Sequence, residues 1–213
     1  MKRIFFTLIA FVAYSNVFCQ TETCATIVKP VFSATAKQEM DQKLAEAKSA
    51  YEGNAKDAEA IIWFGRRTAY PGNYEDAIAI FSKGIELHPA DARFYRHRGH
   101  RYITVRCFDK AISDLKRAAA LFKGKTDEAE PDGMPNAQNI PTSTLQSNTW
   151  YHLGLAYYLK GDFRNAEKAY RACVKVSANP DMYVATANWL HLTLRQLKKI
   201  RKQRRYCEPY SRI

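Results

Sequence analysis

Residues 93 to 106, RFYRHRGHRYITVR, contain five arginines and two histidines in fourteen positions and no carboxylate. Arg93, Arg96 and His100 are spaced three and four residues apart, so a helix would present them on one face. Guanidinium groups pair with carboxylates and phosphates through two parallel hydrogen bonds. The stretch therefore has the composition of an anion-binding surface. The alternative is a helix face exposed to water, which is the commonest role of such charged runs.

A catalytic site is not indicated anywhere in the chain. The sequence contains no GxSxG nucleophile motif, no P-loop and no HExxH zinc motif. It also offers no recognisable set of acid, base and nucleophile. We therefore predict no catalytic residues, no cofactor and no enzymatic activity.

The net charge of +12 is concentrated at the two ends of the chain. Residues 198 to 213 carry seven Lys and Arg against one acid, and Lys2 and Arg3 add two more positive charges. Residues 20 to 197 hold 24 basic and 20 acidic residues, so the stretch at 93 to 106 is a local feature. We expect no nucleic-acid partner for this central part. Electrostatic attachment of the basic tail to nucleic acid or anionic membrane is the alternative function.

The N-terminus is typical of a secretory signal peptide. Lys2 and Arg3 precede the mostly apolar run IFFTLIAFVAY, which is too short to span a bilayer. Val17 and Cys19 are small enough for a signal peptidase site, which would leave Gln20 as the first residue. Lipidation of Cys19 is an alternative, although the bulky Phe18 disfavours it. We predict an exported protein, periplasmic or secreted, with no stable membrane span.

Cleavage would leave four cysteines, Cys24, Cys107, Cys173 and Cys207, which show no CxxC motif and no regular spacing. Export permits disulfides, but this pattern demands none. Cys173 falls at a helix-packing position, where a cysteine usually acts as a small hydrophobe.

Three segments of 34 residues recur along the chain, at 58–91, 92–125 and 147–180. Small residues recur at repeat positions 8, 20 and 27, where they would let two antiparallel helices approach closely, and large apolar residues recur at position 24. In repeat order, the residues are Gly65, Gly99 and Gly154 at position 8; Ala77, Ala111 and Ala166 at position 20; Phe81, Leu115 and Tyr170 at position 24; and Gly84, Ala118 and Cys173 at position 27.

The third segment also contains the pattern W-x2-L-G-x2-Y, and the whole resembles the tetratricopeptide repeat (TPR) family. The resemblance implies an all-α fold, a right-handed superhelical solenoid of stacked helix hairpins. The predicted organisation is a signal peptide (1–19), an N-terminal segment with a capping helix (20–57), TPR 1 (58–91), TPR 2 (92–125), a proline-containing insertion (126–146), TPR 3 (147–180), the first helix of a partial fourth repeat (181–199) and a basic tail (200–213).

The resemblance also implies a concave groove lined by the first helix of each repeat. Carried over position by position, it predicts that a peptide ligand binds at Arg66, Tyr70, Arg93, Arg96, His100, Tyr151 and Tyr158. Arg98 and Arg101 are expected outside the groove. Some TPR proteins clamp a terminal carboxylate with lysine and asparagine, but Ile62 replaces the first lysine and no repeat has the asparagine, so we do not expect that clamp.

His97, His152 and His191 share repeat position 6 and would lie in a row along the first helices. No carboxylate or cysteine joins them at ligand spacing, so we predict no metal site. We expect these histidines to be partly exposed polar residues at the lip of the groove.

The insertion has 21 residues, three prolines and four acids, Asp127, Glu128, Glu130 and Asp132. Loops of this length in compact domains are usually functional or disordered. We hypothesise that the insertion folds over the basic groove and competes with ligands. Overall, the sequence predicts a non-enzymatic scaffold that binds a protein or peptide, with acidic segments as the best match to its groove.

Residues 200 to 213 do not continue the repeat. One hypothesis is a frameshift at the codons of Lys198, Lys199 and Ile200, because back-translation in the shifted frame permits an alanine where Arg205 now stands, at position 20 of a fourth repeat. The alternative is a native basic tail.

Overall fold

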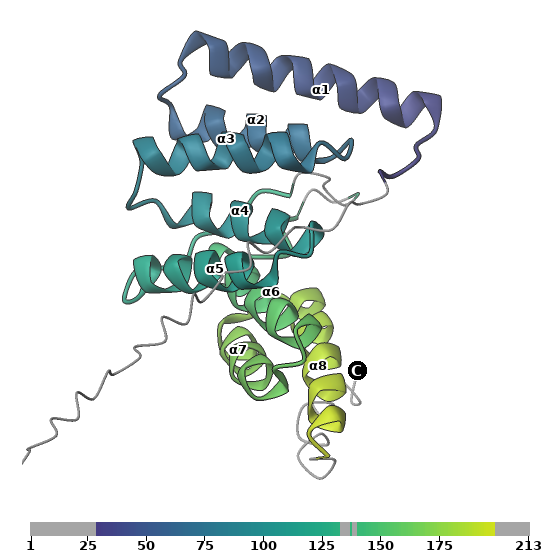
Figure 1. The fold of residues 1–213 in the computed structure, drawn as a ribbon, viewed down its shortest axis with the longest axis vertical. Coiled ribbons are helices and arrows are strands. Elements are labelled where there is room, and N and C mark those ends of the chain that lie inside the picture. Colours follow the sequence, from purple (N-terminus) through teal and green to yellow (C-terminus); the bar gives the residue numbers. More distant parts are fainter. Residues whose placement is uncertain (1–28, 133–136, 138–139, 199–213) are drawn as a thin grey trace, which may run out of the picture.

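The computed structural model describes residues 29 to 132, 137 and 140 to 198. The predicted signal peptide, Cys24, the basic tail and the frameshift hypothesis therefore fall outside the described residues. The described part contains eight α-helices (Figure 1). They are α1 (Ala34–Gly53), α2 (Ala58–Ala69), α3 (Tyr74–Leu87), α4 (Ala92–Thr104), α5 (Phe108–Phe122), α6 (Leu145–Leu159), α7 (Phe163–Val176) and α8 (Pro180–Gln196).

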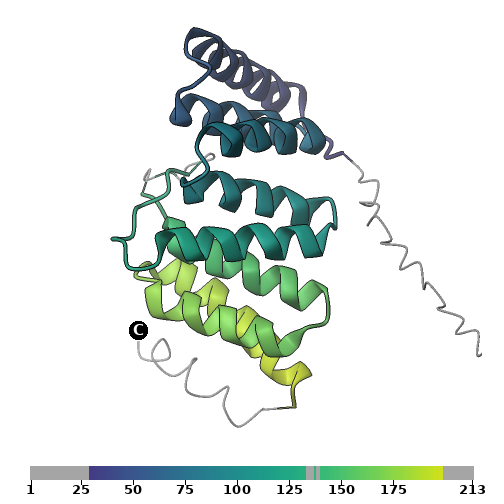
Figure 2. The ribbon, with the colours of Figure 1, turned by 60° about the vertical axis from the view of Figure 1, so that its left-hand side comes forward.

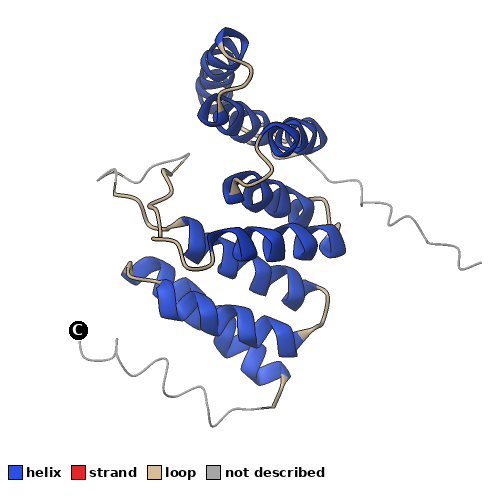
Figure 3. Ribbon diagram, turned by 90° about the vertical axis from the view of Figure 1, so that its left-hand side faces the viewer, coloured by secondary structure: helices blue, strands red, loops and turns tan. Residues whose placement is uncertain are grey.

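The helices form three antiparallel hairpins, α2 with α3, α4 with α5, and α6 with α7, which stack in chain order (Figures 1 and 2). Helix α1 packs on α2 at one end of the stack, and α8 packs on α7 at the other. Figure 3 shows helices joined by loops throughout the described part, where the only β pairing is an isolated bridge between Ala129 and Thr144. The predicted all-α solenoid is confirmed. None of the helices in the described ranges is long and apolar enough to cross a membrane.

Polar residues at the helix starts explain where the hairpins begin. The side chains of Asp57, Asp91 and Thr144 accept hydrogen bonds from backbone amides at the starts of α2, α4 and α6. These amides have no partner inside the helix, so each such cap is worth about 1 kcal/mol.

The turns inside the hairpins use a backbone conformation that glycine adopts most easily. Gly72 and Gly161, at position 15 of the first and third repeats, have φ angles of 98° and 81°. Arg106 holds the same position in the second repeat with φ of 60°, which is costly for a residue with a side chain. The repeat geometry therefore overrides the local preference of Arg106.

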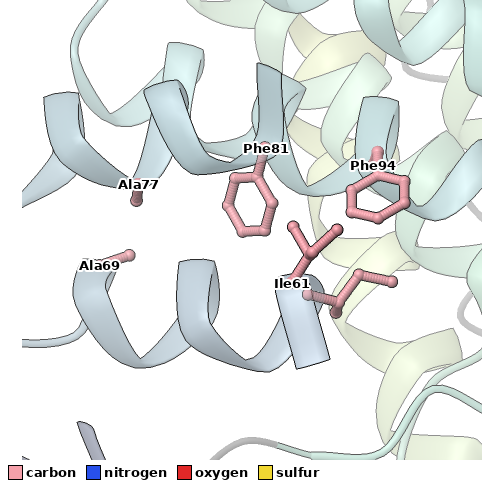
Figure 4. Packing of buried hydrophobic residues seen from close by; sticks show 6 residues of the cluster. Ile61, Ala69, Ala77, Phe81 and Phe94 are labelled. Carbon is pink, nitrogen blue, oxygen red and sulfur yellow. The ribbon is translucent and has the colours of Figure 1, made fainter. Parts of the chain in front are cut away.

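The core is a series of small clusters along the stack. Figure 4 shows the first, in which Ile61 and Ala69 of α2 meet Ala77 and Phe81 of α3, with Phe94 of α4 beside them. Phe94 comes from the next repeat, so this cluster is completed only by stacking. This is the expected behaviour of a solenoid, in which each hairpin buries its apolar face against its neighbours.

The predicted small positions are points of close helix contact. A Cβ atom added at Gly84 would lie 2.2 Å from the Phe94 ring, and one at Gly154 would lie 2.6 Å from the Tyr170 ring. Phe94 and Tyr170 are both completely buried, so neither ring has room to move aside. Glycine is therefore required at both contacts by packing.

We predict that Gly84→Ala destabilises the protein by about 1 to 3 kcal/mol, because the added methyl group overpacks the contact with Phe94. Gly53→Ala is the matched control, since a Cβ atom there meets nothing within 4 Å. In urea unfolding followed by circular dichroism, Gly53→Ala should be neutral or slightly stabilising. Equal midpoints for wild type and Gly84→Ala would contradict this account of the contact.

Candidate functional site

A pocket of about 260 Å³ lies between the first helices of the repeats and the insertion. Its basic side chains come from α2 and α4, its amide and one imidazole from α6, and its carboxylates from the insertion. The polar lining residues are Arg66, Tyr70, Arg96, His97, His100, Arg101, Asn148 and His152 from the helical repeats, and Glu130, Asp132, Thr142 and Ser143 from the insertion.

Arg96 is at the centre of the polar contacts. Its Nη2 lies 2.9 Å from Oε1 of Glu130, and both side chains are almost fully buried, with 8% and 11% exposure. Its Nη1 donates to Nδ1 of His97 at 2.9 Å, while its Nε is buried without a hydrogen-bond partner among the described residues. Burial lowers the pKa of Arg96, and Glu130 opposes that shift.

The insertion enters this pocket as an extended segment. The second carboxylate oxygen of Glu130 accepts a hydrogen bond from Nδ2 of Asn148 at 3.0 Å. The next residue, Pro131, accepts a hydrogen bond at its carbonyl from Nη2 of Arg66 at 2.7 Å. The first helices of all three repeats thus contact the insertion. Helices α4 and α6 contact the side chain of Glu130, and α2 contacts the backbone of Pro131.

Arg66 and Arg101 add two further positive charges to the pocket. Among the described residues, none of the ion pairs within 4.0 Å involves either side chain. Burial lowers the pKa of Arg101 to about 10, and the nearby Arg96 contributes to the shift. Arg101 therefore still carries its charge at neutral pH. The pocket can bind an additional anionic group through these two guanidinium groups.

Three histidines line the same pocket in their neutral form. Burial lowers the pKa of His97 and His100 well below 6.5. The positive charge of Arg96 lowers the pKa of His97 further, and His152 does the same for His100. Burial likewise lowers the pKa of His152 to about 3, followed by the effect of Arg96. The rings of His100 and His152 are 4.0 Å apart between centroids. Nδ1 of His97 accepts from an arginine, which also requires that nitrogen to be unprotonated.

The tetratricopeptide repeat family model matches residues 147 to 180, and no curated protein sequence matches. Residues 147 to 180 form a tetratricopeptide repeat.

Solved structures share the fold of the whole stack. The MamA protein has a TM-score of 0.59 and 20% identity, with 82% of each chain covered. The first TPR domain of human RPAP3 has a TM-score of 0.53 and 19% identity, covering 68% of this chain and 95% of that domain. The first TPR of Spaghetti (RPAP3) bound to the HSP90 peptide SRMEEVD has the same TM-score and identity, with 66% and 93% covered. At these identities the likeness shows the TPR-like fold alone.

The structure divides the predicted site residues into three groups. Arg66, Tyr70, Arg96 and His100 line the pocket together. Arg93 lies in an adjoining pocket of about 200 Å³, where its guanidinium pairs with Asp91 at 2.7 Å and Glu59 at 2.8 Å. Two carboxylates thus satisfy Arg93 within the TPR stack.

Tyr151 and Tyr158 are the third group and pack away from the arginines. The ring of Tyr151 meets that of Tyr170 edge-on at 6.2 Å, and Tyr158 meets Trp189 of α8 at 5.2 Å. Both belong to the cluster formed by TPR 3 and α8. Both side chains help to pack α8 against the third repeat. The first helix of each repeat presents part of its surface to the helix that follows in the stack, so these tyrosines do not face the groove.

Two expectations, one about Arg101 and one about the histidines at repeat position 6, were wrong for residues of the second and third repeats. Arg101 was expected outside the groove, yet it lines the pocket, because it lies four residues after His97 on the same helix face. Arg98 does lie elsewhere and makes a bidentate pair with Asp114 of α5. His97 and His152 were expected at an exposed lip but are buried, with 5% and 8% exposure, because the insertion and neighbouring helices cover them.

The predicted binding residues did not include Asn148 or His152. The TPR resemblance does imply that Asn148, the second residue of the third repeat, faces the groove, and Asn148 lines the pocket. Among the described residues, no group of three or more His, Cys, Asp or Glu side chains could hold a metal ion.

The buried histidines predict a loss of stability in mild acid. Their pKa values are lower in the folded chain than the value of about 6.5 in the unfolded chain, so the unfolded chain binds more protons. The free energy of unfolding therefore falls as pH drops below about 6.5, by up to about 1.4 kcal/mol per pH unit for each histidine. For His152 the fall continues toward pH 3.

We expect the urea midpoint to decrease between pH 7.5 and pH 5.5, and His152→Gln to make that decrease smaller. Glutamine cannot titrate, and its amide can still donate to the carbonyl of Asn148, which His152 contacts at 2.7 Å. An unchanged decrease in His152→Gln would contradict a neutral, buried His152.

Proposed function

We propose that this protein is a non-enzymatic interaction scaffold whose groove binds an extended acidic segment of a partner protein. The observation that carries the proposal is that Arg66, Arg96 and Arg101 bring three guanidinium groups into one pocket. Among the described residues, only Arg96 of these three has a carboxylate partner. Partly buried cations of this kind lack the water that would otherwise solvate them. An anionic ligand would replace that water and pair with them.

The pocket offers groups for both side chains and backbone of such a segment. The guanidinium groups supply planar donors for carboxylates, and Asn148 supplies an amide. Tyr70 adds a ring with a polar tip, a residue type enriched at binding hot spots. The neutral histidines add donors and acceptors without further charge. These groups suit an extended peptide whose acidic side chains point into the groove.

A solved structure with a similar fold supports a peptide as the kind of ligand. The first TPR of RPAP3 is bound to the HSP90 peptide SRMEEVD, whose sequence contains two glutamates and one aspartate. The present chain has a different set of groove residues, with Ile62 lining the adjoining pocket. The peptide sequence it prefers is therefore expected to differ.

An array of immobilised heptapeptides, probed with the labelled protein, tests the proposal. We expect binding to peptides rich in Asp and Glu, and little binding when these residues become Asn and Gln. Arg101→Ala should weaken binding to the best peptide by about tenfold or more in fluorescence anisotropy, because a charge-assisted hydrogen bond is lost.

Arg164→Ala is the matched control for charge. Arg164 is exposed on α7, in the outer layer of the stack, and its removal also subtracts one positive charge. We expect its affinity to stay within about twofold of wild type, since exposed charges at a distance are screened by salt. A similar loss in both variants, or no preference for acidic peptides on the array, would overturn the proposal.

We also propose that the chain acts outside the cytoplasm, after cleavage behind Cys19. Support comes from the leader-like residues 1 to 19 and from Cys107, which is fully buried and disulfide-bonded. Disulfides persist mainly in oxidising compartments.

Expression of the full chain in a bacterial host tests this proposal, and N-terminal sequencing of the extracytoplasmic fraction should give Gln20. Cys19→Arg places a large charged residue at the cleavage site and should leave the precursor uncleaved. A cytoplasmic product that keeps residues 1 to 19 would contradict export, and a lipid on Cys19 would show anchoring instead.

A further inference from the structure

The insertion already places a carboxylate in the groove. Glu130 shares its two oxygens between Arg96 at 2.9 Å and Asn148 at 3.0 Å, and His97 lies 3.7 Å from the first of them. The backbone carbonyl of Pro131 takes a hydrogen bond from Arg66. These are the contacts that an extended acidic peptide would make with the same residues.

We propose that the segment Glu130–Pro131–Asp132 is an intramolecular ligand, and that an acidic partner segment binds by displacing Glu130 from Arg96. This inference rests on the proposed function, because it concerns the regulation of the same groove. The chain's own segment also indicates the chemistry of the displacing ligand, which is a carboxylate side chain followed by a backbone carbonyl that Arg66 can reach.

The contacts that anchor the insertion are separate from those that fill the groove. The side chain of Asp127 accepts hydrogen bonds from the backbone amide of Gln146 at 3.0 Å and from the hydroxyl of Thr144 at 2.6 Å, next to the start of α6. Backbone bonds join Glu128 to Leu145 and Glu130 to Ser143. Displacement of the Glu130 side chain leaves the Asp127 contacts intact, so the groove can open without loss of the cap on α6.

An attached competitor lowers the apparent affinity for a free ligand. The observed dissociation constant is the intrinsic one divided by the fraction of molecules in which the groove is open. A tethered segment acts at an effective concentration near the millimolar range, so an internal contact closes most molecules when its own dissociation constant is well below that range. Loss of the Glu130 carboxylate should therefore raise affinity for an acidic peptide.

The test measures binding of a fluorescein-labelled peptide with the sequence of residues 126 to 133, TDEAEPDG. We expect Glu130→Gln to bind it about tenfold more tightly than wild type, because glutamine pairs weakly with Arg96. The control is Glu128→Gln, which also removes one negative charge from the insertion, but from a residue whose side chain is exposed. Its affinity should stay within about twofold of wild type.

A second variant guards against misfolding, because Glu130→Gln leaves Arg96 buried beside a neutral group. Replacing residues 129 to 143 with a short Gly/Ser linker removes Glu130 entirely and retains Asp127 and Thr144. Circular dichroism should show the wild-type helix content, and the affinity for TDEAEPDG should rise at least as much. The neutral peptide TNQAQPNG should bind none of the variants.

The outcomes separate this inference from the function on which it rests. Equal, measurable affinity in wild type, Glu130→Gln and the linker variant would overturn the inference and leave acidic-segment binding in place. An equal gain in Glu128→Gln and Glu130→Gln would also overturn it, since it would reflect general charge. No binding of TDEAEPDG or of any acidic array peptide, even by the linker variant, would overturn both.

Discussion

A single helix hairpin of this chain cannot bury its own apolar face, and this constraint organises the whole structure. Phe94 of α4 fills the core of the first hairpin and packs directly against Gly84 of α3. Contacts this close need small residues at fixed positions, which sets the spacing between helices. The stack is held by a chain of such contacts, so each hairpin is oriented by its neighbours.

The groove is a consequence of that stacking. The first helices of successive repeats lie side by side, and the side chains that do not pack into the core face a shared space. On α4 these side chains are arginines and histidines. Burial, and after it the neighbouring positive charge, lowers the pKa values of Arg101 and of three histidines. Neutral imidazoles let the pocket hold three arginines without further repulsion.

Glu130 relieves part of that electrostatic cost from within the chain. A nearly buried arginine is unfavourable unless it is paired, and the Glu130 carboxylate is the only ion-pair partner of Arg96 among the described residues. The insertion is therefore part of the groove in this structure. Arg66 and Arg101 have no carboxylate partner in the part of the chain that the structure describes, so charge complementarity with a partner could give specificity at this pocket.

The sequence by itself determined the repeats, the all-α fold and the position of the arginine-rich helix. These follow from local spacing, since Gly65, Ala77 and Phe81 have counterparts at the same positions of all three 34-residue segments and helix periodicity depends on near neighbours. The resemblance to the TPR family implied a shared groove for Arg66, Tyr70, Arg96 and His100, and these four residues line one pocket.

Only the tertiary structure decided which of these groups remain free to bind. Tyr151 and Tyr158 are used to stack α8, and Glu59 of the neighbouring helix pairs with Arg93. Burial of His97 and His152, and the pairing of Glu130 with Arg96, depend on where a 21-residue insertion runs. Such contacts join residues far apart in the chain, and their energies depend on burial, which no local pattern specifies.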